Sequence, residues 1–126
     1  MIGQPKPVTN PEMERMIREF FESCMEPFVA KNAEYAGIDK EDTVEDSLSN
    51  FYEVAKEAGI TPLQVWHVYF EKHRRVVAKY IRTGTFRIPP YKALRDVIGY
   101  AYILYCMGIA SGDWTHEEAV GDPDND

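Results

Sequence analysis

Residues 61–84, with the sequence TPLQVWHVYFEKHRRVVAKYIRTG, decide the fold class. Thr61 is a typical helix N-cap, Pro62 suits the first helical position, and Gly84 is a typical residue just past a helix end. Between them, apolar residues recur at the spacing of one helix face. This stretch therefore predicts a helix that runs from Pro62 to about Arg82.

Three further helices are expected from the same kinds of signal. The first starts at Pro11 after the N-cap Asn10, has apolar positions as far as Phe28, and is followed by a polar loop over residues 36–43. The others span about 44–58 before Gly59 and about 90–107 before Gly108. Pro27 is expected to kink or interrupt the first helix. No pair of strands joined by a hairpin turn is visible. We therefore expect an all-α fold, a compact bundle of about four helices.

The 126 residues suffice for one domain with a modest core. We expect an N-terminal extension over residues 1–10, a helical domain over residues 11–108, and an acidic, disordered tail over residues 109–126. The net charge of −7 argues against nucleic acid as the main partner. No signal peptide and no apolar run of membrane-spanning length is visible, which favours a cytoplasmic protein without a membrane partner. Both cysteines lie in apolar helical patterns and are expected to be buried free thiols.

Polar side chains and their aromatic neighbours lie on or beside the apolar stripes of these helices, where a bundle should be apolar. The set consists of Lys31, Glu34, Tyr35, Asn50, Phe51, Lys72, His73, Asp96 and Tyr100. Lysines and carboxylates are rarely buried unless they are paired or bind something. The set therefore indicates a charged pocket between helices, and we take its members as candidate ligand-binding residues.

The phase of two lysines bears on this pocket. Lys72 lies four residues from both Val68 and Val76, in the middle of an apolar stripe. Its amine could reach water at the edge of the core, or it could point into a cavity toward an anion. Lys31 is in phase with the apolar face of the first helix. Two inward lysines on different helices are harder to dismiss than one.

The last helix carries a second apolar stripe, Tyr100, Ile103 and Met107, opposite its first. A helix that is apolar all round is buried all round, so we expect this helix to be central or shared with another subunit. A homo-oligomer through the last helix is the resulting prediction. Asp96 would then need a partner, and a structural ion pair explains it as well as a ligand does.

Motifs for catalysis and metal binding are weak. Glu19 and Glu22 have the i, i+3 spacing of helical Mg²⁺ ligands, but they share a polar face that we expect to be solvated. His67 lies one turn from Glu71 without a second histidine at zinc-ligand spacing. There is no glycine-rich phosphate loop. We therefore assign no catalytic residue, no metal ligand and no cofactor, with Mg²⁺ needed only if the protein is an enzyme.

An ordered set of these residues resembles a known family. The set is Lys31-Asn-x-Glu-Tyr35, Leu48-x-Asn50-Phe51, Val65-Trp66 with Lys72-His73, and Asp96-x-x-x-Tyr100. It resembles small all-α phage proteins described as nucleotide-modification-associated, which are distantly similar to MazG-type nucleotide pyrophosphatases. The resemblance covers about residues 30–107. It implies a helical fold, oligomerisation through the last helix, and a nucleotide-sized ligand lined by Lys31, Glu34, Tyr35, Asn50, Lys72 and Asp96.

The chain departs from this family where residues 88–92 lack its usual acidic residue, and the paired-carboxylate Mg²⁺ site of the MazG enzymes is not assembled. We therefore expect a phage protein in the host cytoplasm that sequesters a host immune signalling nucleotide without turning it over efficiently. One alternative is a Mg²⁺-dependent nucleotide pyrophosphohydrolase of nucleotide metabolism. A second alternative is an acidic protein–protein inhibitor of a host defence complex, which would bind no small molecule.

Overall fold

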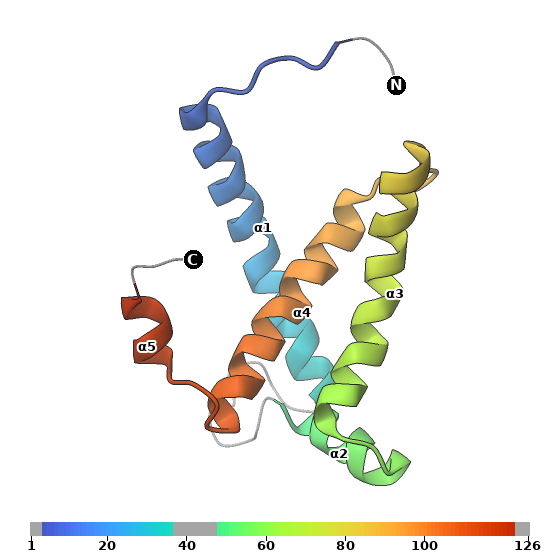
Figure 1. Ribbon diagram of the computed structural model, residues 1–126, viewed down its shortest axis with the longest axis vertical. Helices are drawn as coiled ribbons and strands as arrows, with labels where there is room; N and C mark the ends of the chain where they lie inside the picture. The colour runs from blue at the N-terminus through green and yellow to red at the C-terminus, as the bar shows by residue number, and fades with distance from the viewer. Residues whose placement is uncertain (1–3, 37–47, 123–126) are drawn as a thin grey trace.

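The computed structural model describes residues 4–36 and 48–122, with side-chain positions for residues 4–30 and 48–122. These parts of the chain contain helices and no strand, which confirms the all-α class (Figure 1). The helices are α1 (Asn10–Ala36), α2 (Ser49–Ala58), α3 (Pro62–Thr83), α4 (Tyr91–Ala110) and α5 (His116–Gly121). The last of these was not expected.

The ends of α3 follow directly from its sequence. The Thr61 hydroxyl accepts a hydrogen bond from the Gln64 backbone N–H at 3.1 Å, and the Gln64 side chain accepts one from the Thr61 N–H at 2.8 Å. This reciprocal pair satisfies two donors that a helix start leaves free. At the other end, Gly84 adopts a left-handed conformation with φ of 68° and donates to the carbonyl of Tyr80. The predicted start and end of α3 are confirmed.

Two of the other predicted boundaries need correction. The hydroxyl of Thr9, rather than Asn10, accepts from a first-turn N–H, that of Glu12, so α1 starts one residue earlier than expected. It continues through Pro27 to Ala36, so the expectation that Pro27 interrupts the helix was wrong, while the alternative of a kink stays a prediction. The part of the second expected helix that precedes residue 48 lies outside the described residues, while its predicted end at Gly59 is confirmed by a left-handed φ of 72°.

The core lies where α2 and α4 pack against α3. Phe51 and Ala55 of α2, Val65 of α3, and Ile103 and Met107 of α4 are buried together. Met107 is only 3% exposed. The second apolar stripe of α4 is therefore covered inside one chain, and our reason for expecting a partner subunit on that stripe was wrong.

By length and composition alone, α4 could also cross a membrane, contrary to the expectation that no apolar run reaches that length.

Two glycines of α4 mark close approaches. A Cβ built at Gly99 would lie 2.8 Å from Cδ1 of Phe28, so glycine lets α1 cross α4 at this point. A Cβ at Gly108 would lie 2.1 Å from Cζ2 of Trp114. Gly108 was expected to end the helix, but α4 continues to Ala110, and the glycine instead makes room for the indole ring.

The chain after Trp114 is more ordered than its composition predicted. Thr115 and Glu118 form a second capping box, with the Thr115 hydroxyl accepting from the Glu118 N–H at 3.0 Å, and α5 follows. The Tyr105 hydroxyl lies 2.7 Å from Nδ1 of His116, which ties α5 to α4. The prediction of a disordered tail was therefore wrong for His116–Gly121.

Candidate functional site

Three of the predicted site residues come together between α3 and α4. Nδ1 of His73 lies 3.2 Å from Oδ2 of Asp96, across the two helices. The His73 ring also stacks on the Tyr100 ring, with centroids 5.5 Å apart and planes 25° from parallel. Asp96 and Tyr100 share one face of α4 because they are four residues apart. His73 is 23 residues from Asp96 in the sequence, and the packing of α3 on α4 brings the two side chains together.

The packing beneath the cluster explains its position. Trp66, two turns before His73 on the core-facing side of α3, donates its indole N–H to the Tyr100 carbonyl at 2.7 Å. The Tyr69 ring lies next to the Tyr100 ring at 6.5 Å. These contacts fix the register of α3 against α4 and place His73 opposite Asp96. The two side chains are 19% and 35% exposed, so the cluster lies at the rim of the core, where a solute can reach it.

Lys72 does not point toward this interface. It is exposed, as are Val68 and Val76 one turn before and after it. The face of α3 that packs on its neighbours instead contains Val65, Trp66, Tyr69 and His73. Adjacent residues on a helix point about 100° apart, so the buried face is turned from the stripe of Val68, Lys72 and Val76 that we had expected to be buried. The prediction that Lys72 points into a cavity was wrong.

The other predicted site residues divide into two groups. Phe51 is buried in the core and packs edge-on against Tyr69, so it supports the fold and does not line an open site as predicted. Its neighbour Asn50 is half-buried on α2. The side chains of Lys31, Glu34 and Tyr35 lie outside the described residues, and their roles stay predictions.

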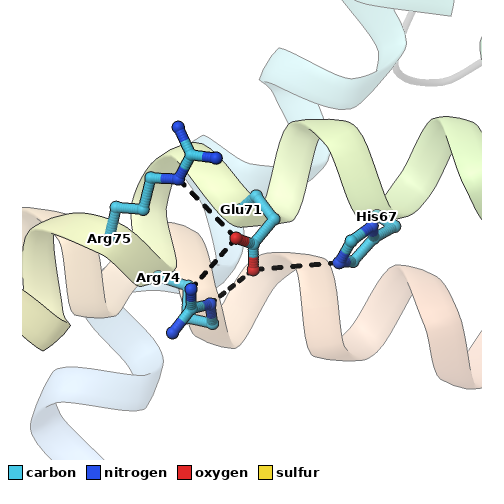
Figure 2. Close-up of polar contacts among 4 residues, drawn as sticks. All are labelled: His67, Glu71, Arg74 and Arg75. Carbon is cyan, nitrogen blue, oxygen red and sulfur yellow. Dashed lines mark hydrogen bonds and ion pairs between the residues drawn. The ribbon is translucent and has the colours of Figure 1, made fainter.

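A second charged cluster lies along the outer face of α3 (Figure 2). The carboxylate of Glu71 receives two hydrogen bonds from Arg74, one of them at 3.0 Å, and lies within 4 Å of Nε of Arg75 and Nε2 of His67. The paired Arg74 side chain holds the pKa of Glu71 below its usual value, and His67 and Arg75 act in the same direction. Of this cluster, only the His67–Glu71 spacing was recognised from the sequence. The i, i+3 and i, i+4 spacing to the arginines was the missed signal.

Charge is strongly segregated along the chain. Residues 62–110 hold eight of the 14 lysines and arginines but two of the 21 aspartates and glutamates, a local net charge of +6 in a chain of net charge −7. The interface between α3 and α4 therefore lies in the basic part of the molecule. Whole-chain charge hid this, and a count over each predicted helix would have revealed it.

A metal site is not visible in the described parts of the chain, since no three His, Cys, Asp or Glu side chains there lie close enough to hold an ion. Glu19 and Glu22 are exposed on α1, and Glu19 pairs with Arg15 at 3.1 Å. The expectation that they form a solvated face is confirmed.

Comparisons of the chain with protein-family models, with curated proteins and with solved structures gave no match.

Proposed function

We propose that this protein binds a nucleotide, or a small anion derived from one, at the rim of the interface between α3 and α4. The observation that supports this most is the His73–Asp96 contact of 3.2 Å, which places a half-buried carboxylate and an imidazole inside the basic part of the chain. Small-molecule sites combine apolar and aromatic side chains with a few placed polar groups, and this cluster holds aromatic and polar side chains side by side.

The chemistry of the cluster suits such a ligand. Asp96 is an acceptor for the hydroxyl groups of a ribose or the N–H groups of a base. The stacked rings of His73 and Tyr100 offer an edge or face for the base itself. Lys92, one turn before Asp96 on α4, and the exposed Lys72 beside His73 supply positive charge for phosphates. On this proposal Lys72 attracts the ligand from the surface.

The proposal is one of binding without efficient turnover. Hydrolysis of a phosphoanhydride through bound Mg²⁺ requires several carboxylates that converge on the metal. The described residues place Asp96 against a histidine, and Glu71, the nearest acidic residue along α3, is already paired with Arg74. Binding without turnover would suit a phage protein that sequesters a host signalling nucleotide in the host cytoplasm.

The test is calorimetric titration with nucleoside mono-, di- and triphosphates and cyclic oligonucleotides, combined with mass spectrometry of small molecules released by heating the purified protein. Asp96→Asn and His73→Ala should each weaken binding about 10- to 150-fold, the equivalent of losing a hydrogen bond to a charged group. His67→Ala is the matched control, because His67 lies on the same helix but outside the cluster.

Several outcomes would contradict the proposal. If no nucleotide is released or bound, the acidic-inhibitor alternative is favoured instead. If both cluster variants bind like the unchanged protein, the site lies elsewhere. Rapid pyrophosphate release with Mg²⁺ or Mn²⁺ that Asp96→Asn abolishes would establish the pyrophosphohydrolase alternative.

A further inference from the structure

The N-terminal half of α1 diverges from α3 and α4, so that the start of the helix lies away from the α3–α4 hairpin (Figure 1). Further along the helix, α1 is held to α4 by the Phe21–Tyr102 ring contact and by Arg95, which lies over the Phe20 ring at 5.6 Å. Before that point the same apolar face continues through Met13, Met16 and Ile17, all exposed. Ile17 is 60% exposed. An apolar stripe on a helix is expected to be covered, and here the described residues do not cover it.

A second uncovered apolar surface lies at the tip of the α3–α4 hairpin, which we define as residues 79–95. Its exposed apolar side chains include Ile81, Phe86, Ile88 and Tyr91. Ile81 is 76% exposed, and Phe86, 59% exposed, meets the Tyr80 ring edge-on with centroids 5.9 Å apart. The tip is thus an apolar patch in the middle of a basic surface.

The two surfaces carry opposite charge. The tip contains Lys79, Arg82, Arg87, Lys92 and Arg95, and no aspartate or glutamate. Residues 10–22 of α1 contain four glutamates and two arginines. Glu12 and Glu14 lie one on each side of the Met13–Ile17 stripe at helical spacing. Each apolar patch is therefore flanked by charge that attracts the other.

We propose that two copies of this chain associate through these surfaces, with the N-terminal half of α1 of each copy packed on the hairpin tip of the other. A two-fold axis makes the contact reciprocal, so one interface covers both exposed patches in both copies. The arrangement replaces the oligomer contact that we had expected on the covered stripe of α4. It shares Lys92 with the proposed nucleotide site but does not depend on nucleotide binding, because neither patch includes His73, Asp96 or Tyr100.

The first experiment is mass determination by light scattering and sedimentation over micromolar concentrations. The unchanged protein should be a dimer. Ile17→Glu and Ile81→Glu should each shift it to the monomer mass with unchanged helical circular dichroism, because both side chains are already exposed in the single chain. Val68→Glu is the matched control: it places the same charge at a 61% exposed position of α3 outside the tip, and it should remain a dimer. A monomeric unchanged protein, or a dimer that survives both variants, would overturn the proposal.

The second experiment reverses charge. A tip variant with Lys79→Glu, Arg82→Glu and Arg87→Glu turns the tip net negative, and an α1 variant with Glu12→Lys and Glu14→Lys turns the α1 half net positive, so each variant should be monomeric. Mixing the two should restore a dimer, because both contacts of the mixed pair again join a net positive surface to a net negative one. Failure of the mixture to associate would refute the charge pairing. If the unchanged protein instead stays monomeric and its tip binds a fluorescent single-stranded oligonucleotide, the basic patch is a nucleic-acid surface and the proposal is wrong.

Discussion

Gly99→Ala probes the crossing of α1 over α4. The new Cβ would lie 2.8 Å from Cδ1 and 3.1 Å from Cε1 of Phe28, whereas ordinary contact begins at about 3.4 Å. The Phe28 ring must therefore move, and with it the edge contact that it makes with Tyr102. Overpacking of this kind costs about 1–3 kcal/mol, while alanine regains about 1 kcal/mol of helix propensity. We expect a net loss of up to about 2 kcal/mol in the free energy of unfolding.

The loss should be local. Packing of α1 on α4 depends on a few aromatic contacts, whereas α3 and α4 share the buried core. Amide hydrogen exchange should therefore accelerate in α1 much more than in α3, and urea denaturation should report the total loss. Gly121→Ala is the control, because a Cβ at that position meets nothing within 4 Å.

A double variant tests whether the new methyl group and the Phe28 ring compete for the same space. Phe28→Leu shortens the ring that the new methyl group meets, so the double variant Gly99→Ala with Phe28→Leu should lose less stability than the two single losses added together. Additive losses, or a Gly99→Ala protein with unchanged stability and unchanged exchange in α1, would refute the account of this crossing.

Two further predictions concern charge and the C-terminal helix. Arg74→Ala should raise the pKa of Glu71 toward its usual value, and Arg75→Ala should raise it less, as NMR titration of the carboxyl group can show. Because the pKa of Glu71 is lowered in the folded chain, its ion pairs stabilise the fold above its unfolded pKa, and this contribution is lost as pH falls through the folded pKa. Gly108→Ala should expel Trp114 from its place against α4 and shift its fluorescence to the red, and an unchanged emission spectrum would contradict the close packing seen there.

The parts of the fold that sequence predicted well are those set by local chemistry. The capping box at Thr61 and the left-handed Gly84 each need only a few neighbouring residues, so they could be recognised without any knowledge of the tertiary structure. Glycine inside α4 shows the limit of that approach. Gly108 looks like a helix stop in sequence, but the nearby Trp114 ring determines its role, and a long-range contact of this kind leaves no local signal.

The candidate site was predicted in part for a similar reason. His73, Asp96 and Tyr100 were all named from sequence, and the structure brings them together. Lys72 was placed on the wrong side because α3 has apolar side chains on two faces, and periodicity alone does not say which face is buried. The aromatic contacts of Tyr69 and Trp66 with α4 decide it.

Two features were missed because the interpretation rested on the average composition of a long segment. The net charge of the whole chain concealed the basic stretch of α3 and α4, and the acidic composition after Trp114 concealed the capping box of Thr115 and Glu118. In both cases the positions of the individual charged residues, rather than their total number, would have predicted the structure. The capping box of Thr115 and Glu118 marks the start of α5 even though the segment is acidic.

The two cysteines differ in a way that has a practical consequence. Cys24 is buried on α1 close to its crossing with α4, as expected, but Cys106 is exposed on α4, so the expectation of a buried thiol there was wrong; neither is in a disulfide. A thiol reagent will modify Cys106 at once in the folded protein, but Cys24 must wait until α1 lifts from α4. The delay between the two modifications therefore measures how often α1 separates from α4. In a chain with Cys106→Ser, the rate of modification at Cys24 alone reports the free energy of that local opening in native buffer.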